Sequence, residues 1–135
     1  MTREELQGRL KQFVLRSFKL LESLPKSIAA TVIGGQLARS SSSSAANYRA
    51  ACRARSGAEF TSRIGVVLEE MDESAFWLEL VIDAGVLPAG RVAPLLEEAK
   101  QLTAIFARSF STARRSRDAQ LVTSSKSSNH QVIKS

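Results

Sequence analysis

The chain has 135 residues, of which 44% are hydrophobic, and this is enough for one domain with one core. Nineteen Lys and Arg against thirteen Asp and Glu give a net charge of +6, which favours polyanionic partners through phosphate neutralisation. No apolar run approaches the roughly 20 residues that a membrane-spanning helix needs. The first residues show no signal-peptide pattern, and the single cysteine, Cys52, excludes an internal disulfide. We therefore expect a cytoplasmic protein without membrane association.

The first segment, residues 4–24, has apolar residues at helical spacing and is predicted to form a helix. Thr2 and Glu5 have the spacing of a capping box, in which a hydroxyl and a carboxylate bond two free amides at the helix start. Pro25 ends this helix, because the residue before a proline avoids the α conformation.

The second predicted helix, residues 27–55, contains five consecutive serines, Ser40 to Ser44. Composition alone indicates a linker there. Against a linker, no Pro or Gly interrupts the run, and alanines, which are strong helix formers, follow it directly. These observations favour a continuous helix, in which the small side chains would let a neighbouring helix approach closely.

The third predicted helix, residues 57–84, has the clearest apolar period. Ser56 and Glu59 have the spacing of a second capping box, and Gly85 is suited to cap the C-terminal end. A fourth helix is expected over 91–115. It should begin near Val92, because Pro94 is tolerated only in a first turn.

Residues 118–135 are rich in Ser, Gln, Asn and Thr and have no sustained period, so we expect a disordered polar tail. The four long helices before it are joined by short connections. Such helices pack as antiparallel neighbours. The predicted fold is an all-α, antiparallel up-down-up-down four-helix bundle over residues 1–117.

The residue pattern argues against an enzyme and against a bound cofactor or metal. The one histidine, His130, lies in the predicted tail, so a di-iron site or a histidine-activated nucleophile would have no base within the fold. Glu70 and Glu73 share a helix face, where a carboxylate site for Mg²⁺ or Ca²⁺ is conceivable. We favour ion pairs between these acids and arginines of the second helix or of a neighbouring subunit.

Three further residues are candidates for a structural polar network or an interface. Asn47 should face Glu70 or Glu73 and fix the register of the helices as a buried polar group, with ligand binding as the alternative. Phe76 and Trp77 are adjacent, so one should face the core and the other a second surface. A subunit interface is preferred there over nucleobase stacking.

Arginines are the candidate nucleic-acid-binding residues, because guanidinium groups pair bidentately with phosphate. Some of them also complement the dipole at the C-terminal end of the fourth helix, which is an alternative reason for their presence. Few aromatic residues accompany them, so contacts with the nucleic-acid backbone are expected, with little base reading. The candidates form two groups, around the second helix and at the end of the fourth: Arg39, Arg49, Arg53, Arg55 and Arg63; Arg108, Arg114, Arg115 and Arg117.

An ordered series of short segments resembles the four-helix bundle proteins encoded in intervening sequences of bacterial 23S ribosomal RNA genes. The likeness spans roughly residues 6–113, with Leu24-Pro25 following the first helix. Its pieces are Gln36-Leu37-Ala38-Arg39-Ser40, Ser44-Ala45-Ala46-Asn47-Tyr48-Arg49, Ala54-Arg55-Ser56 with Glu59-Phe60, and Glu70-Met71-Asp72-Glu73-Ser74-Ala75-Phe76-Trp77-Leu78.

The resemblance implies a helical bundle with the serine run inside the second helix, and a ring-like homopentamer. The accessory protein of diversity-generating retroelements looks like a relative, and there a basic pentameric barrel engages nucleic acid and a reverse transcriptase. Two positions depart from the family pattern: Ala50 replaces a usual Glu, and Glu69 replaces a usual Lys. These departures alter the charge pattern across the two middle helices.

We therefore expect a non-enzymatic homo-oligomer, a pentamer by resemblance, that binds RNA or DNA through arginines in a sequence-tolerant way. The alternative is a protein scaffold or accessory subunit whose arginines form salt bridges between subunits.

Overall fold

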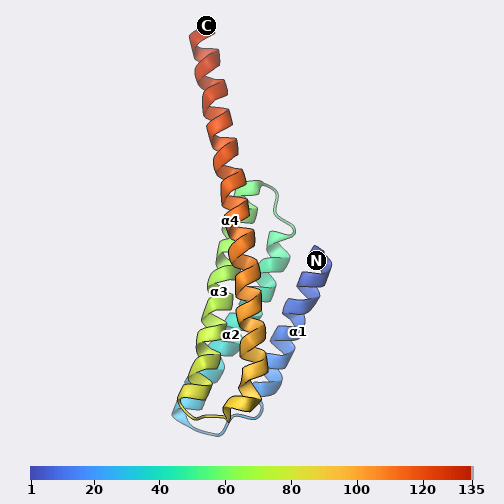
Figure 1. The fold of residues 1–135 in the computed structure, drawn as a ribbon, viewed down its shortest axis with the longest axis vertical. Helices are drawn as coiled ribbons and strands as arrows, with labels where there is room; N and C mark the ends of the chain where they lie inside the picture. The colour runs from blue at the N-terminus through green and yellow to red at the C-terminus, as the bar shows by residue number, and fades with distance from the viewer. Residues whose placement is uncertain (135) are drawn as a thin grey trace.

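A computed structural model describes the backbone of residues 1–134, without the side chains of residues 124 and 126–134. The described residues form four helices and no strand: α1 (Arg3–Leu21), α2 (Ile28–Ala51), α3 (Gly57–Asp83) and α4 (Ala89–Lys134). Each helix packs on the next in the chain, and α1 also packs on α4, which closes the bundle (Figure 1). The predicted all-α, up-down-up-down four-helix bundle is confirmed. None of these helices combines the length and the apolar character needed to cross a membrane.

The first three helices each begin at a hydroxyl cap. The Thr2 hydroxyl accepts from the Glu5 amide and the Glu5 carboxylate accepts from the Thr2 amide, which is the predicted capping box. At α3, Ser56 accepts from the Glu59 amide, but the Glu59 carboxylate accepts from the amide of Arg55. The second predicted capping box is therefore only half formed, because the carboxylate bonds the free amide one residue earlier.

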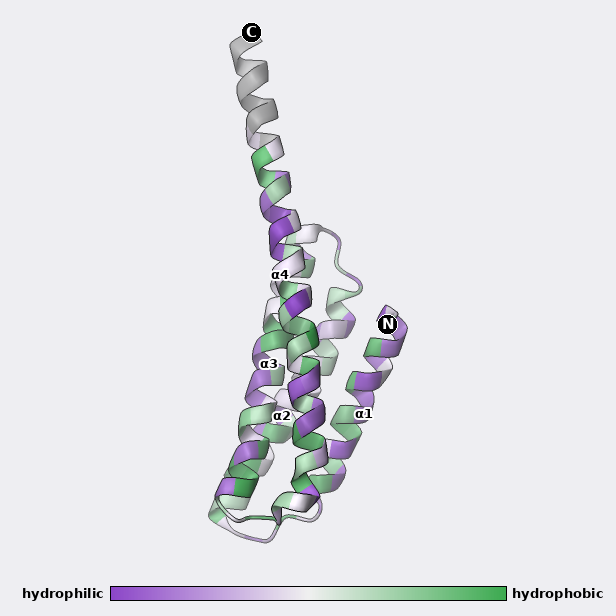
Figure 2. Ribbon diagram, in the orientation of Figure 1, coloured by the Kyte–Doolittle hydropathy of each residue, from purple (hydrophilic) through white to green (hydrophobic). Residues whose placement is uncertain are grey.

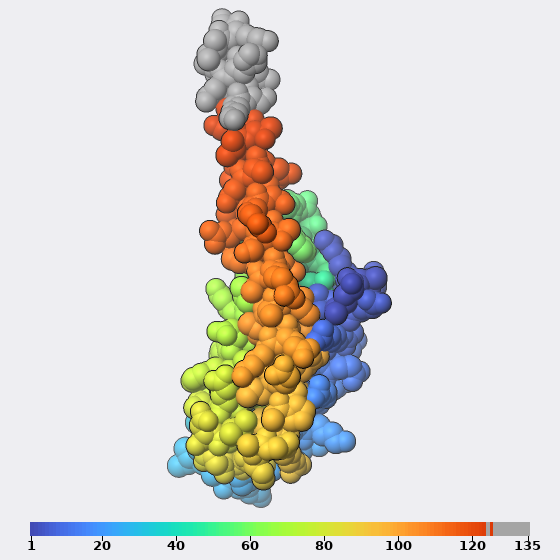
Figure 3. Space-filling model, viewed as in Figure 1, coloured from blue at the N-terminus to red at the C-terminus, as the bar shows by residue number. Residues whose placement is uncertain are grey.

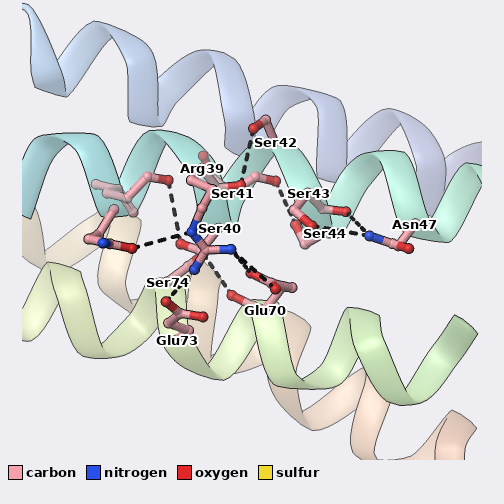
Figure 4. Close-up of polar contacts among 12 residues, drawn as sticks. Arg39, Ser40, Ser41, Ser42, Ser43, Ser44, Asn47, Glu70, Glu73 and Ser74 are labelled. Carbon is pink, nitrogen blue, oxygen red and sulfur yellow. Dashed lines mark hydrogen bonds and ion pairs between the residues drawn. The ribbon is translucent and has the colours of Figure 1, made fainter.

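The five serines lie within α2, so the linker alternative is wrong. Four of the five hydroxyls contact carbonyls of the preceding turn, as Ser42 does with Ala38 at 2.7 Å, and the fifth, that of Ser43, accepts from Asn47. Ser40, Ser41 and Ser44 are fully buried. Ser40 Oγ also lies 2.8 Å from Ser74 Oγ of α3, in the contact between the two helices (Figure 4). Small side chains thus bring α2 and α3 close together, and their polar groups are satisfied inside the contact.

One apolar core runs through the bundle, with fully buried side chains from every helix, among them Phe13, Leu37, Met71 and Phe106. Hydrophobic and hydrophilic residues recur in turn-by-turn bands along the helices of the bundle, as amphipathic helices require (Figure 2). Burying one such large side chain contributes roughly 1.5–3 kcal/mol. Near the C-terminal end of α2 the Tyr48 ring meets the Phe106 ring edge to face, with centroids 5.2 Å apart.

The ends of α1 and α2 come earlier than predicted, at Leu21 and Ala51 in place of 24 and 55. Tight turns with backbone bonds three residues apart take up the remaining positions, as from the Leu24 amide to the Leu21 carbonyl. These turns follow from Pro25 and from the Ser56 cap, each of which prevents the preceding residues from continuing the helix.

The boundaries of α4 also differ from the prediction. It begins at Ala89, before Val92, which places Pro94 in the second turn. A proline there removes a single hydrogen bond, the one to the Gly90 carbonyl, and the rest of the helix continues. No Pro or Gly follows Pro94, and α4 extends past the predicted end at 115 to Lys134.

The part of α4 beyond the bundle coincides with the segment predicted to be a disordered tail. Its backbone is described as helical to Lys134, and Ser135 lies outside the described residues. Residues 118–123 are all exposed and project past the end of the bundle (Figure 3). This exposure agrees with a polar segment that has no apolar face to bury. His130 lies outside the residues whose side chains the structure describes.

Candidate nucleic-acid interface

Arg39 of α2 contacts both acids that the sequence singled out on α3. Its Nη1 lies 3.1 Å from Glu70 Oε2, and its Nη2 donates to Glu73 (Figure 4). The hydrogen bond from Arg39 lowers the pKa of Glu73, and the same bond, together with the nearby charge of Glu70, raises the pKa of Arg39. The predicted ion pairing of these acids with a second-helix arginine is confirmed. The guanidinium of Arg39 is thereby engaged within the chain.

Asn47 does not face Glu70 or Glu73 as predicted. Its Nδ2 donates to the carbonyl and hydroxyl of Ser43, at 2.9 and 3.1 Å, and its Oδ1 accepts from Arg63 Nη1 at 3.1 Å. Because Ser40 lies opposite Ser74 in this antiparallel pair, the position opposite Asn47 comes about one turn before Glu70, within reach of Arg63. Asn47 therefore links α2 to α3 through Arg63 and not through a carboxylate.

Phe76 and Trp77 divide between surface and core. Trp77 is partly buried against the core, and its Nε1 donates to Glu73 Oε1 at 3.3 Å. Phe76 is 49% exposed, and the two rings meet edge to face with centroids 5.0 Å apart. The predicted split between a core side and a second surface is confirmed. Among the described side chains, no group of three or more His, Cys, Asp and Glu residues is placed to hold a metal ion.

The other candidate arginines lie in two segments, 46–63 and 108–117, which meet at the end of the bundle around the connection between α2 and α3 (Figure 1). These segments contain eight arginines, no lysine and one carboxylate, Glu59. Arg117 pairs with Asp118 at 3.2 Å, and the other seven form no salt bridge with any described residue. We call this set the arginine end: Arg49, Arg53, Arg55, Arg63, Arg108, Arg114, Arg115 and Arg117.

A groove between α1 and α2 holds the first part of the arginine end. Arg49 lies in the last turn of α2 and Arg53 in the turn that follows the helix; both are exposed and line this groove of about 710 Å³. Its lining includes small residues of α2, among them Ala45 and Ala46. Arg55 lies in an adjoining groove that Arg49 and Arg53 also line. Three guanidinium groups thus gather on one surface, with two carboxylates, Glu4 and Glu59, beside them.

A second groove, of about 590 Å³, lies between the start of α3 and the middle of α4. Arg108 and Arg117 line it together with hydroxyl groups of α4, and the Nε of Arg117 is buried without a hydrogen-bond partner among the described atoms. Gly57, the first residue of α3, also lines this groove, so the positive end of the α3 dipole adds to its potential. The hydroxyl groups are those of Ser109, Thr112 and Ser116.

The aromatic rings of the arginine end already have partners. The Arg3 guanidinium lies 5.0 Å above the Phe60 ring, and that of Arg114 lies 5.8 Å from the Phe110 ring. Tyr48 is buried, and this burial, with a hydrogen bond to Cys52, raises the pKa of Tyr48 to about 12. The described part of this surface therefore presents charge and hydroxyl groups more than bare ring faces, which suits contact with a phosphate backbone.

Two features of the structure were not predicted from the sequence. Arg9 of α1 forms a bidentate pair with Glu98 of α4, at 2.9 and 2.6 Å, which ties the first helix to the last. A row of exposed acids also runs along the outer side of α3, with spacings of three, seven and four residues that keep it on one side of the helix. Its members are Glu69, Asp72, Glu79 and Asp83.

The chain was compared with known proteins. A crystal structure of a protein of unknown function from the S23 ribosomal protein family of Bacteroides thetaiotaomicron superposes with a TM-score of 0.72. The two chains are 24% identical over 78% of this chain and 97% of the other, a likeness that shows a shared fold. No curated protein matches the chain. The family model described as 23S rRNA-intervening sequence protein matches residues 5–108. Because that match covers most of the bundle, the chain belongs to the 23S rRNA-intervening sequence protein family.

Proposed function

We propose that this protein is a non-enzymatic, cytoplasmic homo-oligomer that binds RNA or DNA through the arginine end in a sequence-tolerant way. The observation that carries the proposal is the excess of arginine at one end of the bundle, where segments 46–63 and 108–117 together contain eight arginines and one carboxylate. Glu4 of α1 and Asp118 add two carboxylates beside these segments, which leaves a clear excess of cations. Arginines placed for internal pairing would have acids beside them, as Arg39 does. Arg39 therefore stays outside the proposed interface.

The proposed contact is with the sugar–phosphate backbone. Guanidinium groups bind phosphate oxygens in pairs, and the hydroxyls of the groove at α4 add neutral donors. The most exposed aromatic side chains among the described residues, Phe18 and Phe76, lie outside the arginine end. Base stacking at this surface would therefore contribute little.

We further propose that several copies assemble, five by analogy with the relatives that the sequence resembles. Repetition of one arginine end around an assembly multiplies affinity by effective concentration, without any new contact. By the same analogy, a reverse transcriptase is a proposed protein partner.

The test is the salt dependence of binding to a fluorescent duplex RNA and a fluorescent duplex DNA, measured by anisotropy. Each phosphate contact contributes about 0.9 to the slope of log affinity against log salt concentration. Arg49→Ala with Arg53→Ala should lower that slope by about two and weaken all sequences alike. Failure of the wild-type assembly to bind either duplex at low salt would refute the proposal.

A matched control removes two cations from elsewhere on the molecule. Lys26 and Lys100 are both exposed and form no salt bridge with a described residue. The variant with Lys26→Ala and Lys100→Ala has the same net charge as the arginine variant. This variant should keep the wild-type slope. If both variants lowered the slope equally, net charge and not the position of the arginines would be responsible for binding.

The alternative function is a protein scaffold, which the exposed acids of α3 favour because they could pair with arginines of a neighbouring copy. Light scattering separates the two functions. If Arg49→Ala with Arg53→Ala dissociates the assembly, these arginines hold subunits together. If the assembly survives and nucleic-acid affinity falls, they bind phosphate.

A further inference from the structure

The outer face of α3 carries a regular acidic stripe with an aromatic residue at its centre. Its positions are three or four residues apart and therefore lie on one side of the helix. All are exposed, and Phe76 in the middle is 49% exposed. We call this the α3 face: Glu69, Asp72, Phe76, Glu79 and Asp83.

The acids of the α3 face have no cationic partner among the described residues. Segment 69–83 contains no Lys or Arg, and the four carboxylates of the face form no salt bridge with any described residue. Arg39 is occupied by the other two acids of the segment, Glu70 and Glu73. Like charges three and four residues apart destabilise a helix, so this row carries a cost that a cationic partner would remove.

The outer face of α1 has the opposite charge and an apolar centre. Leu15 is 53% exposed and Phe18 is 42% exposed, both large apolar side chains left outside the core. Segment 11–21 contains three cations and no acid, and all three are exposed. We call this the α1 face: Lys11, Leu15, Arg16, Phe18 and Lys19.

The two faces cannot meet within one molecule. α1 packs along α2 and α4 and lies on the opposite flank of the bundle from α3 (Figure 1). Its first residue, Arg3, reaches the Phe60 ring of α3, but neither residue belongs to the two faces. Each copy therefore presents a cationic apolar face on one flank and an acidic aromatic face on the other.

We propose that the α1 face of one copy docks on the α3 face of the next. The proposal deepens the assembly that is part of the proposed function and rests on it. Leu15 and Phe18 would pack against Phe76 at the centre, and the cations and acids would pair around this apolar contact. Because the two faces differ, the contact is heterologous, and repetition closes into a ring when the rotation between copies allows it.

A second copy of this chain fits better than other occupants. A symmetric contact of two α3 faces would set acids against acids, and one of two α1 faces would set cations against cations. Nucleic acid is repelled by the acidic face. Only a pairing of unlike faces satisfies the charges of both, and every copy supplies one of each.

The test is charge reversal with mass measured by size exclusion and light scattering. Asp72→Lys with Glu79→Lys should reduce the assembly to the monomer mass of 14.7 kDa. Lys11→Glu with Lys19→Glu should do the same, and the chain with all four changes should reassemble because its faces are complementary again. Circular dichroism should show unchanged helix content throughout, since all four positions are exposed.

A second measurement does not depend on charge. In a Cys52→Ser background, the chain carrying both Leu15→Cys and Phe76→Cys should form a ladder of disulfide-linked multimers on mild oxidation. Chains carrying only one of these cysteines should not be linked.

The outcomes separate the possible failures. A monomeric wild type would overturn the assembly and this contact together. An assembly whose mass survives both reversals, or that the four changes together do not restore, would overturn the contact alone. Nucleic-acid binding is measured separately by the salt slope of the Arg49 and Arg53 variant, which leaves both faces intact.

Discussion

At the scale of residues, the contact between α2 and α3 depends on hydroxyl groups in a position where apolar side chains are usual. Ser40, Ser44 and Ser74 are fully buried. Ser44 and Ser74 each donate to a carbonyl of their own helix, which leaves the Ser74 oxygen free to accept from Ser40. The Ser40 and Ser74 hydroxyls also meet across the helices at 2.8 Å. The small size of these serines therefore lets the backbones of α2 and α3 approach closely, and the same serines satisfy their own polar groups.

The Ser40–Ser74 pair should show coupling in a double-mutant cycle. Ser74→Ala leaves the Ser40 hydroxyl with only a long bond to the Leu37 carbonyl at 3.5 Å, so a loss of about 1–2 kcal/mol in unfolding free energy is expected. Ser40→Ala should lower the unfolding free energy by less in the Ser74→Ala chain than it does in the wild type. Urea unfolding measures this, with exposed Ser111→Ala as a neutral control. Additive losses would show that the two hydroxyls do not interact.

The contact between Arg39 and Glu73 predicts a dependence of stability on pH. The pKa of Glu73 is lowered from 4.5 in the folded chain by the hydrogen bond from Arg39, so the carboxylate stabilises the fold above the unfolded value. This contribution is lost as pH falls through the folded pKa. The difference in melting temperature between wild type and Glu73→Gln should therefore be present at neutral pH and vanish in acid. Glu22→Gln controls for removal of a surface carboxylate, and a difference that persists in acid would contradict the prediction.

At the scale of elements, α4 serves two different roles along its length. Its first half contributes Leu95, Ala99, Leu102 and Phe106 to the core. Past the bundle, residues 118–123 are exposed, and Leu121 and Val122 are 61% and 55% exposed. A helix without packing is marginal in water, so the extension depends on its continuity with the packed half.

Removal of residues 121–135 should leave the unfolding free energy within about 0.5 kcal/mol of the full chain, because the described residues of this part bury no apolar surface. By contrast, Phe106→Ala should cost about 3–5 kcal/mol, since this ring is fully buried against Tyr48. Denaturant titration of both variants makes the comparison. A large loss on truncation would show that the extension packs on the bundle.

At the scale of the whole molecule, charge is unevenly distributed. The arginine end collects eight cations, while segment 69–83 of α3 holds six acids and no cation. A polyanion should therefore approach at one end of the bundle, and a neighbouring copy should meet the flanks. The two proposed contacts adjoin, because Lys11 and Leu15 of the α1 face also line the groove that holds Arg49 and Arg53.

If one nucleic acid crosses both grooves of the arginine end, the effects of the two grooves on the salt slope should add. Arg49→Ala with Arg53→Ala and Arg108→Ala with Arg117→Ala should each lower the slope by about two, and the fourfold variant by about four. Anisotropy over a range of salt concentrations measures all three. If the fourfold variant bound nucleic acid no more weakly than one of the double variants, only one groove would be in use.

Much of this fold follows from local patterns. Apolar spacing predicted the four helices, and hydroxyl caps at Thr2 and Ser56 set two of their starts, because caps and periodicity act within a few residues. The serine run was ambiguous by composition, and helical continuity was favoured by the absence of Pro and Gly. The acidic pair on the third helix was also recognised, since residues three apart share a face whatever they contact.

The tertiary structure decided which of these groups meet. Arg39 pairs with two acids, while Arg49 and Arg53 form no salt bridge with a described residue. Asn47 bonds Arg63 in place of Glu70 or Glu73. Such choices depend on the relative register and rotation of α2 and α3, which close packing of the buried serines determines. The sequence by itself determined the helices, their caps and the net charge, because these depend on neighbours along the chain. Only packing between helices determined which arginines remain available to a partner.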